Sequence, residues 1–366
     1  MIDLSLMKDL RVDPAAMTIT AGGGVTWGEL NAAAYEHGLA TTGGVISTTG
    51  VAGLTLGGGL GWTMGKHGMA IDNLISADVV LASGDMVRTS ADAEPDLFWA
   101  IRGGGGNFGV VTSFTFRAYR LSTVLAGPAV HPLPAARDAL KFFRQFTQSL
   151  PDELTVFAAL RHAPDGSGMK LCAIPVCHIG QDEASAERDV KPIREFGPHV
   201  MDMIERMPYP QVNTQLDDAF PKGGLNYWKS AFFTELSDDA IHKLVTAFEA
   251  TPSTECVLVI EHFDGAVTRV DPTATAFPHR ARGYNLIIIS QWTDPADTDV
   301  GIAWARGTYD SLQPHMADGA YVNYLDHDDT NRVRAAYGPN YDRLRDLKRR
   351  YDPQNLFHLN QNIPPN

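Results

Sequence analysis

The chain has 366 residues, enough for about two domains that each bury a core. With 44% hydrophobic and 20% charged residues, its composition argues against intrinsic disorder and against a membrane bundle. Acidic residues outnumber basic ones by 43 to 30, and the net charge of −13 argues against nucleic acid as the main partner.

The first forty residues predict two strands and a helix. The first strand is expected almost from the start of the chain, and the second over residues 17–25. Thr26 and Glu29 have the spacing of a capping box, and Gly38 marks the end of the helix that follows. The opening residues contain no signal peptide, and no apolar run nears the ~18 residues of a membrane span, so we expect a soluble, cytoplasmic protein.

Glycine is concentrated early in the chain. Of the 34 glycines, 21 precede residue 110, and they are densest over residues 41–68. This stretch has neither helical nor strand periodicity, which predicts an ordered loop. Backbone without Cβ atoms, together with nearby hydroxyl side chains, would suit a long, flat ligand that carries a diphosphate. Tight turns packed against a sheet are the alternative.

The next segment predicts a strand pair over 73–89, a short helix, and a strand from Val110. In that strand, residues 110, 112, 114 and 116 are expected on one side. Residues 104–109 match the pattern GxGxxG of dinucleotide-binding folds. However, they follow a helix and precede a strand, the reverse of the order that an NAD-type Rossmann fold requires.

After about residue 120, glycine becomes rare and helices alternate with strands. Helices are predicted over 134–149, 182–196 and 238–250, and strands over 154–161, 168–177, 256–263 and 284–292. The last two strands are too apolar for a sheet edge, so we expect them at its centre. Because strand pairs recur without regular βαβ alternation, the pattern predicts an α+β fold with a sheet covered by helices on one side.

Two further features have no catalytic interpretation at this stage. The cysteines lie in apolar segments without metal-ligand spacing, so buried free thiols and no metal site are expected at Cys172, Cys177 and Cys256. The charged segment 343–352 alternates acids and bases at helical spacing, which predicts a solvated helix face.

Five separated motifs resemble those of one enzyme family. They are the glycine segment 43–73, "DLFWAIRGGGGNFGVVTSF" at 96–114, "FPHR" at 277–280, "YVNY" at 321–324, and the segment 340–365 ending in "NQNIPP". The chain is identified from them as similar to FAD-linked oxidases of the vanillyl-alcohol oxidase superfamily, with a PCMH-type FAD-binding fold, and to the berberine-bridge-enzyme-like group in particular. The resemblance implies a FAD-binding domain over 1–120, a substrate-binding domain over 121–320, and a segment over 321–366 that returns to the first domain. It also implies that the sheet of the second domain is antiparallel.

The resemblance also implies which residues contact FAD. They are Gly44, Ser47, Thr48, Thr49, Gly50, Gly53, Leu54, Gly57, Gly59, Gly61, Gly109, Val111, Tyr324, Asn360, Gln361 and Asn362. Many relatives carry a cysteine that bonds the flavin where this chain has Ile46, so bicovalent attachment is not expected. Relatives also hold the flavin through a histidine in an R-x-GGH loop. Because no histidine here lies in such a loop, the chain resembles a member that lacks the first part of its FAD domain.

The candidate base is a tyrosine. Relatives place a carboxylate on the strand after "FPHR", but counting back from Trp292 puts Asn285 there, and an amide cannot accept the proton. Tyr324 resembles the tyrosine that other members use, although a phenol with a pKa near 10 needs help from the flavin or a cation. Packing at a strand end is the alternative for Tyr324, and Tyr321 and Tyr284 are alternatives for the base.

Four more residues are candidates for the wall of the substrate cavity: Glu261, His262, Tyr227 and Lys229. A satisfied structural pair at Glu261 and His262, and plain packing at the other two, are the alternatives.

These observations predict an FAD-dependent oxidase, with O₂ as acceptor and an alcohol of a sugar or secondary metabolite as substrate. Tyr324 would take a proton while hydride passes to the flavin. A flavin-free or inactive member of the fold that acts as a binding protein is the second hypothesis. The expected partners are a small-molecule substrate and O₂, without nucleic acid or membrane, and the chain is expected as a monomer or homodimer.

Overall fold

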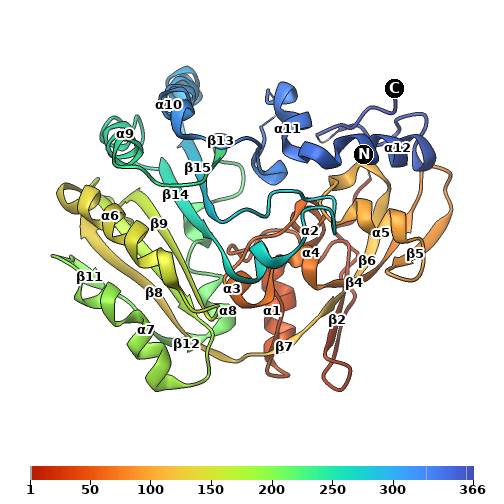
Figure 1. Ribbon diagram of the computed structural model, residues 1–366, viewed down its shortest axis with the longest axis horizontal. Helices are drawn as coiled ribbons and strands as arrows, with labels where there is room; N and C mark the ends of the chain where they lie inside the picture. Colours follow the sequence, from red (N-terminus) through yellow and green to blue (C-terminus); the bar gives the residue numbers. More distant parts are fainter. Residues whose placement is uncertain (1, 327, 360) are drawn as a thin grey trace.

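The computed structural model describes residues 2–326, 328–359 and 361–366, and two main β-sheets organise it (Figure 1). The smaller sheet has the strand order β1-β2-β6-β4-β5, with antiparallel neighbours throughout. Its strands are β1 (Leu10–Asp13), β2 (Thr18–Gly22), β4 (Leu74–Val80), β5 (Met86–Ser90) and β6 (Val110–Arg117). The predicted first strand therefore starts later than expected, at Leu10.

Helices α1 (Trp27–Tyr35) and α5 (Pro95–Ile101) pack on the smaller sheet. The capping box of α1 is confirmed, because the Thr26 hydroxyl accepts from the Glu29 backbone and the Glu29 carboxylate accepts from the Thr26 backbone. Two short strands, β3 (Leu39–Ala40) and β7 (Tyr119–Arg120), form a separate antiparallel pair at the end of this part of the chain. We call residues 10–120, together with the C-terminal helices below, the small-sheet unit.

The prediction of a loop throughout 41–68 is wrong. The segment contains α2 (Val51–Gly57) and α3 (Met64–His67), and α4 (Ala70–Asn73) follows directly. Glycine is a poor helix former, but Val51 and Met64 are buried in the core. Packing of such apolar side chains stabilises helical turns that the glycine content disfavours.

The larger sheet has the order β11-β8-β10-β9-β14-β15-β13, with β12 also paired to β8 and every pair antiparallel. As predicted, the apolar strands β14 and β15 lie inside it. Its strands are β8 (Thr123–Pro132), β9 (Leu154–His162), β10 (Lys170–His178), β11 (Met201–Asp202), β12 (Glu205–Pro208), β13 (Leu225–Phe233), β14 (Val257–Phe263) and β15 (Gly283–Trp292).

Helices cover one face of the larger sheet, as predicted (Figure 1). They are α6 (Ala136–Phe146), α7 (Glu183–Glu195), α9 (Asp238–Glu249) and α10 (Thr298–Leu312). We call this the outer face. On the opposite, inner face, Phe157, Phe232 and Phe263 share a core with Leu60 and Trp62 of the small-sheet unit. A short helix, α8 (Tyr209–Val212), joins the same core.

The last helices, α11 (Val333–Tyr337) and α12 (Tyr341–Tyr351), return to the small-sheet unit, so that the blue end of the chain lies over its orange part in Figure 1. The prediction that 343–352 forms a solvated face is wrong at two positions. The side chains of Lys348 and Asp352 are 0% exposed and form an ion pair of 2.7 Å. Lys348 points inward because its ammonium also donates to the carbonyls of Asn107 and Phe357.

Cys172, Cys177 and Cys256 are buried free thiols, as predicted. Within the described part of the chain, no helix is long and apolar enough to cross a membrane. The same residues contain no group of three or more acidic, histidine or cysteine side chains that could hold a metal ion.

Candidate active site

Two of the five motifs meet where the small-sheet unit faces the larger sheet. The Tyr321 hydroxyl accepts a hydrogen bond of 2.7 Å from the Gly59 backbone, and the Asn323 amide donates to the Leu54 carbonyl at 2.9 Å. A Cβ at Gly57 would overlap the Asn323 side chain. The "YVNY" segment is therefore docked directly on the glycine segment.

The "FPHR" motif joins the two units and contacts no reactive group. The Arg280 guanidinium donates to both carboxylate oxygens of Asp72 at 2.8 Å, and Arg280 is 3% exposed. His279 Nε2 lies 2.8 Å from the carbonyl oxygen of Ala336. Both side chains are thus committed to holding neighbouring segments together.

Asn107, inside the GxGxxG-like segment, binds the C-terminal segment. Its side-chain NH2 group donates to the backbone carbonyls of Gly104 and Gln361 at 2.9 and 3.1 Å. Its side-chain oxygen accepts from the backbone N–H of Ile363 at 3.1 Å. Asn107 was not among the predicted site residues, although its place between glycines was a usable signal. Asn360 lies outside the described residues.

The residues assigned to FAD fall into two classes. Gly50 and Gly53 are exposed, and a Cβ at either would meet nothing within 4 Å, so their backbone is open to a ligand. Thr48 is exposed beside them, and Thr49 and Leu54 are partly exposed. The Asn362 side-chain oxygen is buried, and no described residue is hydrogen-bonded to it. These atoms fit a cofactor that binds through hydrogen bonds along 48–54 and at the C-terminal segment.

Other glycines in this set allow the protein itself to pack closely. A Cβ at Gly44 would meet Leu54 and Trp27, and Cβ atoms at Gly59 and Gly61 would overlap Ala70 and the Gly43 backbone. Gly109 similarly makes room for β4, and the Val111 side chain is buried in the core. Any contact that these positions make to FAD is therefore left to their backbone.

Ser47 has a partner that sequence reasoning missed. Its backbone N–H and its hydroxyl donate to the two carboxylate oxygens of Asp217, at 2.9 and 2.5 Å. Asp217 belongs to the segment that connects α8 to β13. This contact therefore fixes that connecting segment of the larger sheet against the glycine segment. Nothing in the sequence pattern relates these two distant positions.

The structure brings Tyr324, Glu261 and Asn285 together on the inner face. Glu261 and Asn285 are cross-strand partners of β14 and β15. The Tyr324 hydroxyl donates to Glu261 Oε1 at 3.2 Å, and the Asn285 amide donates to Oε2 at 2.7 Å. The Tyr324 ring also contacts the Tyr321 ring, edge to face at 4.7 Å.

Burial controls the proton affinity of this cluster. Glu261 is 3% exposed, and desolvation raises its pKa to about 7. Burial, followed by the negative charge of Glu261, raises the pKa of Tyr324 well above its ordinary value. Among the described ion pairs, none places a cation on Glu261. The described groups that shift the pKa of Tyr324 also include no cation, and the Glu261 carboxyl is the group of this cluster whose pKa lies near neutral pH.

Four predicted site residues lie on the outer face, away from this cluster. The Tyr284 hydroxyl is 2.9 Å from that of Thr147. Lys229 forms ion pairs of 3.0 and 2.7 Å with Asp328 and Asp329, and the Tyr227 hydroxyl donates to Asp328.

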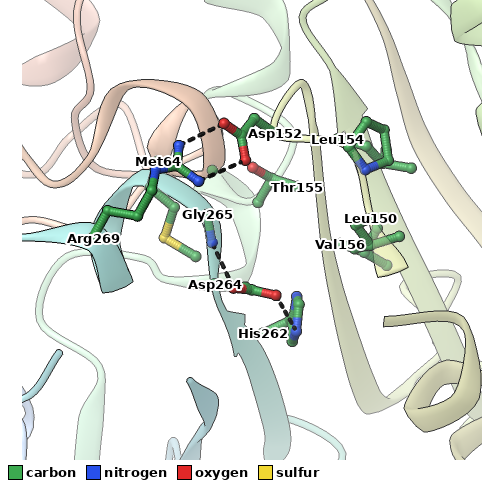
Figure 2. Close-up of a pocket in the computed structure, with 12 residues that line it drawn as sticks. Met64, Leu150, Asp152, Leu154, Thr155, Val156, His262, Asp264, Gly265 and Arg269 are labelled. Carbon is green, nitrogen blue, oxygen red and sulfur yellow. Dashed lines mark hydrogen bonds and ion pairs between the residues drawn. The ribbon is translucent and has the colours of Figure 1, made fainter. Parts of the chain in front are cut away.

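The fourth is His262, whose Nε2 lies 4.0 Å from Asp264 Oδ2. It lines a pocket of about 250 Å³ at the ends of β9 and β14, together with Asp264 and Arg269 (Figure 2). Burial lowers the pKa of His262 to about 4. None of the four is brought to Tyr324.

Known proteins share this fold and these motifs. Residues 1–90 match the family profile described as "FAD binding domain", and residues 320–364 the one described as "Berberine and berberine like". An FAD-linked oxidoreductase of Dictyostelium discoideum is 31% identical over 369 residues, which cover all of this chain and 79% of that protein. (R)-6-hydroxynicotine oxidase of Paenarthrobacter nicotinovorans is 29% identical over all of this chain and 81% of that protein.

Solved structures agree. 6-Hydroxy-D-nicotine oxidase from Arthrobacter nicotinovorans matches with a TM-score of 0.89 and 29% identity, over 100% of this chain and 82% of that one. A variant of berberine bridge enzyme in complex with (S)-reticuline matches with a TM-score of 0.87 at 23% identity. The match covers 100% of this chain and 80% of that one, and it shows that the two have a similar fold. The chain therefore belongs to the FAD-linked oxidoreductases of the berberine-bridge-enzyme-like group, with a PCMH-type fold and FAD as its cofactor.

Proposed function

We propose that the chain is an FAD-dependent oxidase that removes hydride from an alcohol or similar carbon of a sugar or secondary metabolite, with O₂ as acceptor. The oxidase named among its relatives supports this reaction class. When bound, FAD supplies the redox chemistry by accepting the hydride. The chain's own residues bind and orient the substrate and move its proton.

The contact that carries this proposal is the hydrogen bond from Tyr324 to Glu261. A substrate hydroxyl would pass its proton to Tyr324 Oη while the tyrosine's own proton moves to Glu261 Oε1. Asn285 holds the other carboxylate oxygen in place. In this relay Glu261 is the proton acceptor and no phenolate forms, which avoids ionising a tyrosine whose pKa is strongly raised.

The relay has a definite pH dependence. Glu261 must be ionised to accept the proton, and its pKa lies at about 7. Substrate oxidation should therefore rise with pH through about 7 and reach a plateau above it.

The first test is whether the purified chain of 366 residues binds FAD. Protein that is yellow, or becomes so with excess FAD, agrees with the proposal. Protein that stays colourless would overturn it and favour the alternative of a flavin-free binding protein.

The second test measures flavin reduction by any alcohol or amine that reduces the wild-type protein. Tyr324→Phe and Glu261→Gln should each slow it by ~10²–10⁴, the usual effect of losing a general base, and E261Q should also lose the rise near pH 7. Tyr284→Phe should stay close to wild type. A large loss in Y284F with little in Y324F would instead assign the role to the outer face.

A further inference from the structure

Beyond Glu261 and Asn285, the inner face of the larger sheet becomes mainly apolar. Two residues further out along the strands, Ala159, Val259 and Ile287 form the next row, and Ser230 of β13 lies beside Ile287 in it. In the row after that, Val257 is paired with Ile289, and Ile289 with Trp228. Such a surface offers few hydrogen-bond partners to a ligand with many hydroxyl groups.

Aromatic rings continue this surface towards Tyr324. The Trp228 ring centroid lies 6.1 Å from that of Tyr324 and 6.0 Å from that of Phe220. Phe220 belongs to the same connection as Asp217, which is fixed on Ser47. The Trp228 indole N–H is buried and has no hydrogen-bond partner among the described residues.

Arg161 stands at the far end of the apolar rows. It follows Leu160, the partner of Leu258, and shares the inner face with Phe157 and Ala159 because alternate residues of a strand point the same way. It is half-buried, and its Nε donates to the carbonyl of the neighbouring His162 at 3.2 Å.

Among the residues that the structure describes, Arg161 has no counter-ion. No carboxylate of the described chain lies within ion-pair distance of it, and burial lowers its pKa. By contrast, the more deeply buried Lys229, Arg280 and Lys348 each have a carboxylate within 3.0 Å. A cation that is partly removed from water without a partner is costly, and an anionic ligand would offset that cost.

We propose that the substrate is an apolar, partly aromatic molecule with a carboxylate at the end remote from the reacting carbon, and that Arg161 binds this carboxylate. The body of the molecule lies along Val259, Ile287 and Trp228, and the reacting carbon lies at Tyr324 and Glu261. Four residues along a strand and one strand across separate the Cα atoms of Arg161 and Glu261 by roughly 14 Å. The inference rests on the proposed function and narrows its substrate class to acidic secondary metabolites.

A pair of rigid probes tests the proposal: 4'-(hydroxymethyl)biphenyl-4-carboxylate and the corresponding neutral carboxamide. Calorimetric titration of the full chain should show that the carboxylate binds at least tenfold more tightly. Arg161→Gln should abolish this preference, and Arg161→Lys should keep part of it, because lysine retains the charge but loses the planar fork. Arg11→Gln, at an 82% exposed side chain of the small-sheet unit, is the control and should keep it.

Equal affinity of the two probes for the wild type would overturn the proposal. A preference that survives in R161Q would do the same, and so would failure of both probes to bind. If both probes reduce the flavin without preference, the proposed function stands and only the substrate class fails. If the preference appears in protein that cannot be loaded with FAD, the Arg161 site stands and the oxidase function fails.

Discussion

At the scale of single residues, Glu261 has the property that the proposed chemistry needs. Its carboxyl is almost fully buried between Tyr324 and Asn285, and burial raises its pKa from 4.5 to about 7. A group with a raised pKa binds its proton more tightly in the folded than in the unfolded chain. Its contribution to stability is therefore complete below pH 4.5 and is lost as pH rises to 7.

Glu261→Gln should remove this pH dependence. In the wild type, ionisation of Glu261 should lower the free energy of unfolding by about 3 kcal/mol between pH 4.5 and pH 7, on the scale of 1.36 kcal/mol per pKa unit. Glutamine cannot ionise. Its side-chain oxygen can accept from Tyr324, and its NH2 group can donate to the side-chain oxygen of Asn285 if that amide turns over. Urea unfolding of both proteins at pH 5 and pH 8 should show the smaller decrease in E261Q.

The pH dependence of the wild type must be compared with that of E261Q. In both proteins, His67 and His262 change the free energy of unfolding with pH in the opposite direction to Glu261. Burial lowers the pKa of each to about 4, so their contribution is present above pH 6.5 and is lost on acidification. Glu255→Gln, at an exposed position, controls for the loss of one negative charge. Equal pH dependence in the wild type and E261Q would contradict the raised pKa.

Tyr324 and Glu261 could be chosen as candidates from the sequence, but the hydrogen bond between them could not be predicted from it. Whether a residue of β14 or β15 points to the inner or outer face depends on a shift of one position, as the neighbours Glu261 and His262 illustrate. Strands that are apolar on both faces carry no alternation from which that choice could be predicted. For the same reason, the sequence could not show that Tyr284, an alternative for the base, lies on the outer face.

At the scale of elements, the predicted helices and strands after residue 120 were close to those found, because amphipathic patterns dominate there. Two errors have local causes. In β6, the pairing with β4 shifts between Asp78 and Val79, so Val111 is buried with Phe114 and the predicted single side does not hold. In α12, the alternation of acidic and basic residues predicted an exposed face, and the burial of Lys348 could not be predicted from it.

Lys348→Met should destabilise the protein by about 3–5 kcal/mol, because it leaves the Asp352 carboxylate buried without its cation. It also leaves the carbonyls of Asn107 and Phe357 without their donor. Chemical denaturation measures the change. Lys191→Met is the matched control, since Lys191 has the same i,i+4 spacing to Glu195 but both side chains are more than 60% exposed. It should cost less than about 1 kcal/mol, and equal losses would contradict the argument.

At the scale of the whole molecule, the candidate site combines residues of the two units, whose sheets lie side by side in Figure 1. Glu261 and Asn285 come from the larger sheet, whereas the open backbone at Gly50 and Gly53 comes from the small-sheet unit. Composition and periodicity predicted strands and helices in both parts of the chain but could not predict how the two units meet. The motif resemblance supplied the order of the segments, and the side-chain contacts between them required the structure.

Arg280→Met should weaken the junction of the two units. The guanidinium is 1% exposed and makes two bonds of 2.8 Å to Asp72, so its removal leaves a nearly buried carboxylate unpaired. We expect a loss of about 3–5 kcal/mol in the free energy of unfolding, measured by urea denaturation. Arg269→Met removes a similar two-bond pair with Asp152 at exposed side chains, and should cost at most about 1 kcal/mol. If the cost in R280M arises from the unpaired charge, adding Asp72→Asn should restore part of the stability. A double variant no more stable than R280M would show instead that packing of the Arg280 side chain holds the units together.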